Sequence, residues 1–212
     1  MSDITKRAMA QSLKKFLRKK DLDKITINDI TSDCGVNRQT FYYHFKDIYD
    51  LLEWIYVNDL VEKVENDTTI FNWQEKFAYV MNYMLENKDF IIGTYNSVSR
   101  KILLDFLFKH YNNLFIGLLN SFKESYDVDE KDKKFIANFY KYGFAGIIEG
   151  WIVDEMREDP DIILKKLNLM ITGNLEDSLK KCQKIKNNKK YTKGRLCTKL
   201  VLIYFFVYCI KL

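Results

Sequence analysis

Side chains that can bind bases and phosphates cluster between residues 37 and 46, where the sequence reads NRQTFYYHFK. The Arg38 guanidinium can pair with guanine, the Gln39 amide with adenine, and the Thr40 methyl with the thymine methyl group. Tyrosine hydroxyls and the Lys46 ammonium can reach backbone phosphates. This combination of residue types points to the recognition of double-stranded DNA.

A helix over these residues would separate a core side from a reading side. At about 100° per residue, Phe41 and Phe45 point the same way and should be buried. The opposite side is polar or cationic and carries Gln39, Tyr43 and Lys46, flanked by Thr40 and Tyr42. Packing of Tyr42 and Tyr43 on neighbouring helices remains the alternative to a role in reading DNA.

Local signals predict the helices that position this segment. An amphipathic helix with a cationic rim runs from Thr5 to about Leu17. Thr26 stands at an N-cap position with Asp29 three residues later, as in a capping box, so a short helix should span about Ile27 to Cys34. Gly35 breaks that helix. Helix, glycine turn and helix together form a helix-turn-helix outline.

The next helix begins at Asn37, which we include among the DNA-contacting residues. A fourth helix should open at Asp47 and carry three apolar residues on its inner face, namely Leu51, Leu52 and Ile55.

The stretch ITINDITSDCGVNRQTFYYHFKDIYDLL resembles the TetR family of bacterial transcription regulators. The family pattern of a glycine turn and a recognition helix ending in Tyr-x-His-Phe-Lys is matched by Gly35, Val36, Thr40, Phe41, Tyr42, Tyr43, His44, Phe45 and Lys46. The match covers about the first 55 residues. The phrases NRQTFYYHFKDIYDLLEWIY and FYKYGFAGIIEGWI further resemble the DhaS-like subgroup of that family.

The resemblance implies a set of DNA contacts: a phosphate at Thr26, base edges at Arg38, Gln39 and Thr40, and the DNA backbone at Tyr42, Tyr43, His44 and Lys46. His44 points nearer the core side, so a partly buried histidine remains its alternative. Many family members carry a second lysine two positions after Lys46, where this chain has Ile48. We therefore expect one phosphate contact fewer and a softer affinity.

The middle of the chain, residues 51–180, is predicted to be a helical domain for ligand binding and dimerisation. Rings are frequent there, and most should be core. No arrangement of Ser, His, Asp or Cys supports catalysis, so we do not expect an enzyme. Family analogy implies a small-molecule effector, or in some members a protein partner, acting here; the residues that would bind it are unknown.

A dimer interface is predicted on two later helices. Gly143, Gly146 and Gly150 form a smooth strip on a long apolar helix, where another backbone can approach closely. A second helix should start at Asp159 and Pro160, with its own apolar stripe of Ile163, Leu167 and Met170. The alternative is that both strips face the protein's own core. Two DNA half-sites one helical turn apart favour the homodimer.

Residues 181–212 form a basic and then apolar tail that we place outside the core fold. Its apolar run, Leu200 to Ile210, has eleven residues, fewer than the roughly 20 that a membrane-spanning helix needs. Four interpretations of the tail stay open. It could be loosely docked or disordered, add a strand or helix to the body, owe nothing to the parent fold, or bind an anionic membrane surface.

Composition supports the all-α class and excludes others. The chain has 8 glycines and 1 proline among 212 residues, too few for the turns of a strand-rich fold. With 2 histidines and four scattered cysteines it offers no metal-ligand cluster, so we expect no metal and no cofactor. No signal peptide is evident, which predicts a cytoplasmic protein.

Charge is divided unevenly along the chain. Residues 1–50 have ten Lys and Arg against seven Asp and Glu, whereas residues 51–177 have fourteen against twenty-two. A basic amino-terminal piece joined to an acidic middle indicates that the amino-terminal piece meets the polyanion.

The sequence thus predicts a helix-turn-helix DNA-binding domain over residues 1–50, a helical domain over 51–180 and a tail. The expected function is a dimeric regulator, most simply a repressor, that binds a near-palindromic operator. Activation, as in the DhaS-like subgroup, is the alternative mode. A membrane-associated protein that uses the tail and an interaction module without DNA binding are the rivals from other classes.

Overall fold

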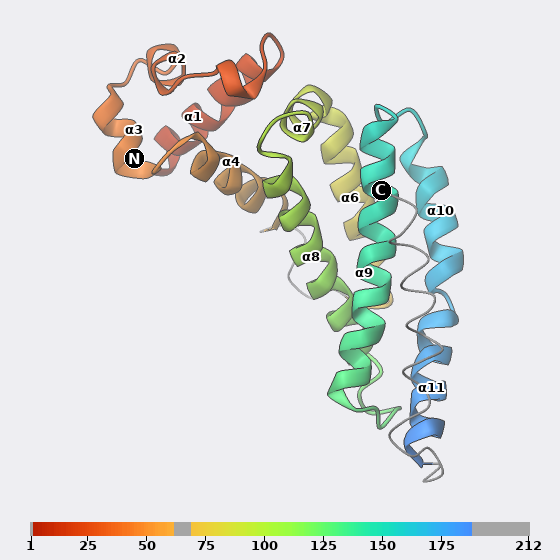
Figure 1. The fold of residues 1–212 in the computed structure, drawn as a ribbon. Coiled ribbons are helices and arrows are strands. Elements are labelled where there is room, and N and C mark those ends of the chain that lie inside the picture. The colour runs from red at the N-terminus through yellow and green to blue at the C-terminus, as the bar shows by residue number, and fades with distance from the viewer. Residues whose placement is uncertain (1, 62–68, 188–212) are drawn as a thin grey trace.

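The computed structural model describes residues 2–61 and 69–187, and the regular elements in these ranges are all helices, as predicted (Figure 1). In chain order they are α1 (Ser2–Leu17), a 3₁₀ turn η1 (Leu22–Lys24), α2 (Ile27–Asp33), α3 (Arg38–His44), α4 (Ile48–Tyr56), a π-helical turn η2 (Val57–Val61), α6 (Trp73–Glu86), α7 (Lys88–Tyr95), α8 (Arg100–Asn120), α9 (Glu130–Val153), α10 (Pro160–Ile171) and α11 (Asn174–Asn187).

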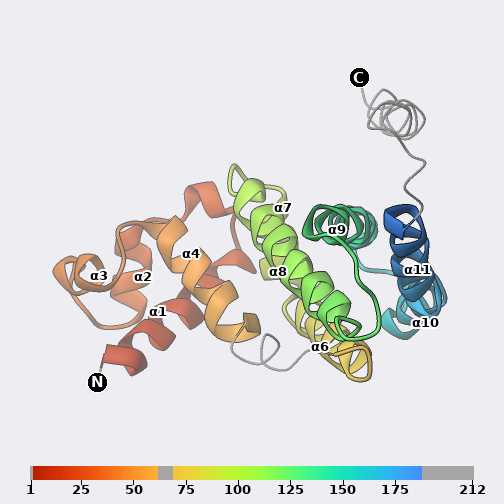
Figure 2. The ribbon, with the colours of Figure 1, turned by 90° about the horizontal axis from the view of Figure 1, so that it is seen from below.

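Helices α1 to α4 gather at one end of the molecule, to one side of the longer helices (Figure 2). Met9 and Leu13 of α1 pack one helical turn apart and are fully buried together with Ile30 of α2 and Phe41 of α3. Leu51 and Leu52 of α4 close the same core and are also fully buried. Four amphipathic faces therefore meet around a small core that fixes α3.

Helix α4 belongs to both parts of the molecule. Its last residue, Tyr56, is fully buried, with ring centroids 5.4 Å from Phe90 of α7 and 5.1 Å from Phe106 of α8. The domain boundary predicted after residue 50 falls inside this helix. The apolar face of α4 is long enough to serve both cores, so the chain does not part at that point.

Rings from α6, α8 and α9 form the core of the body, by which we mean helices α6 to α11. Phe144 lies at the centre, with ring centroids 4.8 Å from Phe115, 5.4 Å from Phe77 and 6.1 Å from Trp73. All three of these contacts are edge-on, an arrangement that aromatic quadrupoles favour. The expected aromatic core is present; Phe71, which precedes α6, is an exception and is almost fully exposed.

Helix α10 begins where the sequence predicts. The Asp159 carboxylate accepts a hydrogen bond from the backbone N–H of Asp161 at 2.9 Å, and Pro160 occupies the first helical position, where no N–H is needed. The Trp151 indole of α9 donates to the Glu158 carbonyl at 2.8 Å and holds the preceding turn.

The apolar stripe of α10 corrects part of the dimer prediction. Ile163 and Leu167 are only 4% and 2% exposed within a single chain, because α10 packs on α6 and α11 through that stripe. They cannot form a contact surface for a second copy. Met170 points elsewhere and is 59% exposed. Ile163 and Leu167 instead pack on the protein's own core, which was the alternative to the dimer interface.

The helical body extends past the predicted boundary at residue 180. Helix α11 continues to Asn187, with Cys182 partly buried against the core. The Lys186 ammonium pairs with Asp127 at 2.7 Å and Asp129 at 3.0 Å, on the loop before α9. The remainder of the predicted tail, residues 188–212, lies outside the described residues. Among the helices within the described ranges, none has the length and apolarity to traverse a bilayer.

Candidate DNA-binding surface

The turn between α2 and α3 depends on Gly35. Its φ of +67° lies in the left-handed region that glycine adopts without steric cost. The Val36 N–H donates to the Thr31 carbonyl at 3.0 Å, which closes the end of α2 with the six-residue bond of a Schellman motif. Val36 packs against the core. This glycine turn sets the direction in which α3 leaves α2.

The start of α2 has the predicted capping box. The Thr26 hydroxyl accepts from the Asp29 N–H at 3.1 Å, and the Asp29 carboxylate accepts from the Thr26 N–H at 2.7 Å. Lys20 donates to the same carboxylate at 2.8 Å and, together with both Thr26 donors, lowers the pKa of Asp29 to about 2. The Thr26 hydroxyl also donates to Asp29 at 2.8 Å, so its proton is already engaged.

Helix α3 follows Asn37, where the sequence predicts the helix to begin, and Asn37 caps it. The Asn37 side-chain oxygen accepts from the Thr40 N–H at 2.8 Å and from the Thr40 hydroxyl at 3.0 Å. The cap uses the Asn37 oxygen and leaves its two amide N–H donors for another partner. The Thr40 methyl is the part of that side chain that remains for an apolar contact.

The two sides of α3 are separated as the sequence predicts. Phe41 and Phe45 are buried at 0% and 3% exposure. Tyr42 and Tyr43 are 52% and 82% exposed, so neither is a core residue. We call the outward residues of this helix the reading face: Arg38, Gln39, Thr40, Tyr42 and Tyr43.

The residues after α3 are held by a second cap. The Asp47 carboxylate accepts from the Asp50 N–H at 2.9 Å, and the Asp50 carboxylate accepts from the backbone N–H of Lys46 at 2.9 Å. The Lys46 side chain is exposed beside the reading face. His44 is partly buried, and its ring lies edge-on to Tyr43 with centroids 4.9 Å apart, so the structure places it between the two sides.

A network of hydrogen bonds and one ion pair links α1 to the body, and the sequence did not predict it. We call it the bridge; its four residues are Lys14, Asp59, Tyr83 and Asn87. The Lys14 ammonium donates to the Asp59 carboxylate at 2.7 Å, the Tyr83 hydroxyl at 2.9 Å and the Asn87 side-chain oxygen at 3.1 Å. Tyr83 in turn donates to Asp59 at 2.9 Å. Its members lie 45 to 73 residues from Lys14, and no local pattern connects such distant positions.

The charges of this bridge are stabilised by one another. Burial opposes ionisation of Asp59, but the hydrogen bond and charge of Lys14 outweigh it, so the pKa of Asp59 lies below its ordinary value. Burial and the neighbouring Asp59 carboxylate raise the pKa of Tyr83, which therefore stays a hydrogen-bond donor. The bridge is intact at neutral pH and joins α1, η2 and α6.

A second surface lies along α9. Side chains built at Gly143, Gly146 and Gly150 would meet nothing within 4 Å, so these glycines face open space. Phe139, 63% exposed, lies one turn before Gly143 on the same face. We call this surface the α9 strip, and it consists of Phe135, Phe139, Tyr142, Gly143, Gly146, Ile147, Gly150 and Val153.

A capped helix-turn-helix with an exposed polar recognition helix on a helical body defines the class of DNA-binding regulators. Comparison with known families agrees. Residues 14–55 match the family of bacterial regulatory proteins named tetR, and residues 71–173 match a transcriptional regulator C-terminal region. The chain belongs to the TetR family of transcriptional regulators.

Individual relatives share about a quarter of their residues with this chain or fewer. The HTH-type dhaKLM operon transcriptional activator DhaS of Lactococcus lactis subsp. lactis is 26% identical over 154 residues, which span 72% of this chain and 81% of DhaS. A solved structure of the dihydroxyacetone kinase operon activator DhaS aligns with a TM-score of 0.65 and 24% identity, over 85% of this chain and 98% of that one. The TetR family repressor AlkX from a Dietzia strain aligns with a TM-score of 0.49 and 16% identity, over 81% and 98%.

Proposed function

We propose that this protein is a homodimeric repressor that binds a near-palindromic operator in the cytoplasm and is released by an effector acting on the body. The observation that carries the proposal is the reading face, which presents polar side chains outward from a helix whose other side is locked in a core. Repression requires only that the bound dimer blocks access to the promoter. Activation, the role of the relative DhaS, needs an additional contact with the transcription machinery.

The residues of the reading face and their neighbours Asn37, His44 and Lys46 divide into two roles. Arg38, Gln39 and the Thr40 methyl lie in the first turn of α3, the part of a recognition helix that meets base edges. The remaining residues would hold the DNA backbone: Asn37 through its amide, Tyr42, Tyr43, His44 and Lys46. Thr26 could bind a phosphate only if its hydroxyl proton moved away from the Asp29 carboxylate.

The α9 strip supports a dimer in this proposal. Its members recur every three or four residues, so they form one continuous face of a helix of 24 residues. The glycines allow a second backbone close approach, and the exposed rings would leave water on contact. Met170 on α10 is a further exposed apolar residue of the proposed interface. The proposed partner of the α9 strip is a second copy of this chain, because a helix-turn-helix protein reads two half-sites with two chains.

Sedimentation of a charged variant tests the dimer. A Gly146→Glu chain should fold normally, because a side chain there meets nothing in the single chain, yet it should sediment as a monomer. Gln11→Glu, an exposed neutral-to-acidic change on α1, is the matched control and should remain a dimer. A dimeric Gly146→Glu protein would place the interface elsewhere.

A reporter fused to the upstream region of the gene separates repression from activation. Deleting the regulator should raise expression if it represses, and the Gln39→Ala/Tyr43→Ala variant should behave like the deletion. Lower reporter expression in the strain without the regulator would show that the protein activates the gene instead.

A further inference from the structure

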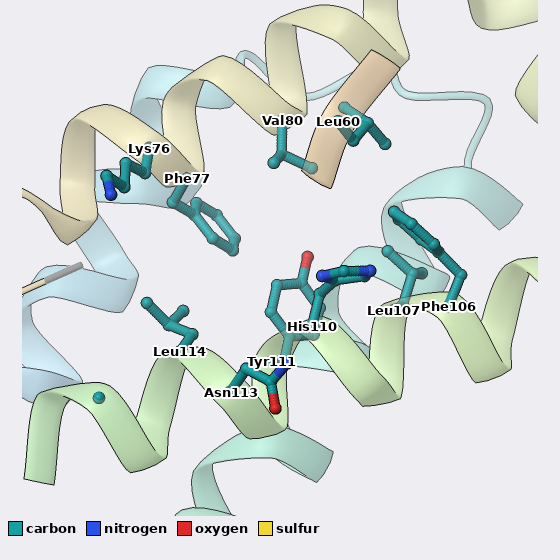
Figure 3. Close-up of a pocket in the computed structure, with 11 residues that line it drawn as sticks. Leu60, Lys76, Phe77, Val80, Phe106, Leu107, His110, Tyr111, Asn113 and Leu114 are labelled. Carbon is teal, nitrogen blue, oxygen red and sulfur yellow. The ribbon is translucent and has the colours of Figure 1, made fainter. Parts of the chain in front are cut away.

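A cavity of about 120 Å³ lies inside the body, between α6 and α8 (Figure 3). Its lining is largely apolar: Phe77 and Val80 of α6 and Leu107 and Leu114 of α8 contribute, and Leu60 of η2 closes one side. A dry engineered cavity of about 150 Å³ accommodates a benzene molecule. The space is therefore suited to a ligand of one ring.

The Tyr111 hydroxyl is a buried polar group at this cavity. The side chain is 4% exposed, and its oxygen has no hydrogen-bond partner among the described residues. The hydroxyl points into the cavity (Figure 3). The rings of Phe77 and Phe144, with centroids 5.9 Å and 6.1 Å from that of Tyr111, keep it in that direction. Because buried hydroxyls are normally paired, this one is placed to bond an atom that a ligand brings.

The protonation of Tyr111 decides what kind of atom that is. Burial raises the pKa of the Tyr111 hydroxyl, so it keeps its proton at neutral pH and can donate. In folded proteins a buried donor without an acceptor is rarer than an acceptor with a lone pair to spare. The group that completes the site is therefore a hydrogen-bond acceptor, and a carbonyl oxygen is a compact one.

The apolar lining selects an uncharged acceptor. An ion that leaves water for such a lining loses far more free energy than one hydrogen bond from a tyrosine returns, whereas one hydrogen bond can largely offset the loss for a carbonyl group. Lys76, His110 and Asn113 also line the cavity, but each already interacts with another group of the protein. The polar contact with the ligand is therefore assigned to Tyr111.

We infer that this cavity binds a small neutral carbonyl compound of one ring. The ring lies among Phe77, Leu107 and Leu114, and the carbonyl oxygen accepts a hydrogen bond from Tyr111. As the effector site of the regulator, the cavity rests on the proposed function; as a binding site, it does not.

The π-helical turn η2 connects the cavity to the bridge. Leu60, 3% exposed, closes the cavity, and the preceding residue, Asp59, pairs with Lys14 of α1 at 2.7 Å. Turns of this kind are rare and often lie at functional sites. A ligand that displaces Leu60 moves the turn that holds α1, and this is the route by which occupancy of the cavity reaches the reading face.

Titration calorimetry on the full chain, without DNA, tests the binding site with cyclohexanone as the probe. One cyclohexanone should bind per chain. Methylenecyclohexane, in which a CH₂ group replaces the carbonyl oxygen, is the matched ligand without an acceptor. Tyr111→Phe should weaken cyclohexanone binding about tenfold and leave methylenecyclohexane binding unchanged. Val80→Phe, which places a ring in the cavity from a partly buried position, should abolish binding of both.

Two charged analogues test whether the cavity prefers a neutral ligand. Cyclohexylammonium and cyclohexanecarboxylate keep the ring, and each should bind at least about tenfold more weakly than cyclohexanone. Denaturant unfolding checks that the variants are folded. Tyr111→Phe removes an unpaired hydroxyl and should not lower the urea midpoint.

Three results would overturn the inference. They are the absence of cyclohexanone binding at millimolar concentration, a cyclohexanone affinity that Tyr111→Phe leaves unchanged, and either ion binding as tightly as the ketone.

The effector role is tested on operator DNA. DNA binding is first measured on the ligand-free protein, so failure of the regulator proposal can be recognised on its own. Saturating cyclohexanone should then change operator affinity several-fold in wild type and not in Val80→Phe. An unchanged affinity in wild type would contradict the effector role.

Discussion

The helices that carry the reading face and the helices of the body are stabilised in different ways. Helices α2 and α3 have seven residues each, too few to persist alone, and are fixed by caps at Thr26 and Asn37 and by the Gly35 turn. Helices α8 and α9 have 21 and 24 residues and are joined through packed rings around Phe144. Local hydrogen bonds thus set where the short helices begin and turn, and a small core around Phe41 holds them together, whereas the body depends mainly on packing between long helices.

Truncating a ring in either core should produce the largest effect on stability. Phe41→Ala and Phe144→Ala each remove a buried ring and should cost about 3–5 kcal/mol in the free energy of unfolding. Denaturant titration followed by circular dichroism measures both. Phe41→Ala should also abolish operator binding. A cost below about 1 kcal/mol for Phe41→Ala would mean that α3 is positioned by its caps alone.

Breaking the bridge between the two regions should cost less. Asp59→Asn leaves the partly buried Lys14 ammonium without its counter-charge and should destabilise by about 1–3 kcal/mol. Asp89→Asn is the matched control, because its pair with Arg18 is long, at 4.0 Å, and exposed, and should cost less than about 1 kcal/mol. Lys14→Met should add little to Asp59→Asn in a double-mutant cycle. Full additivity would show that the two residues act independently.

Changes on the reading face and at the adjacent Lys46 should leave stability intact and alter DNA binding. Gln39→Ala should lose about 1–3 kcal/mol of discrimination at one operator position. Lys46→Ala should weaken binding to every sequence and reduce the slope of log affinity against log salt by about one. Anisotropy titrations on operator and random DNA separate these outcomes. Equal losses on random DNA for both variants would invalidate the division into reading and anchoring residues.

The capping box should give a small, pH-dependent contribution. The pKa of Asp29 falls from 3.8 to about 2 on folding, so the unfolded chain binds the proton first as the pH drops. The carboxylate therefore stabilises the fold above pH 3.8 and loses that effect toward pH 2. The stability difference between wild type and Asp29→Asn should be constant at neutral pH and shrink across that window. A stability difference that does not change with pH would show that the charge of the Asp29 carboxylate is not its cause.

The same division explains which features the sequence could predict. The cap at Thr26, the helix starts at Asn37, Asp47 and Asp159, and the turn at Gly35 were predicted correctly, because each is encoded within a few residues. The burial of Phe41 beside the exposure of Tyr43 follows from helical period alone. The DNA contacts assigned to these residues stay a prediction.

Features that depend on distant packing were missed or misjudged. Ile163 and Leu167 form a regular apolar stripe, and periodicity cannot tell whether such a stripe faces a second copy or α6 of the same chain. The Lys14 bridge and the cavity at Tyr111 join segments dozens of residues apart. The buried Tyr111 hydroxyl has no hydrogen-bond partner among the described residues, and no local sequence pattern marks that environment.

Whether α3 reads a DNA sequence is measured by fluorescence anisotropy on the gene's own upstream DNA over a salt series, with random DNA as control. We expect tight, sequence-selective binding that saturates at two chains per site and is lost in Gln39→Ala/Tyr43→Ala. Binding that is equally strong on random DNA, or unchanged in that double variant, would show that α3 does not read the sequence.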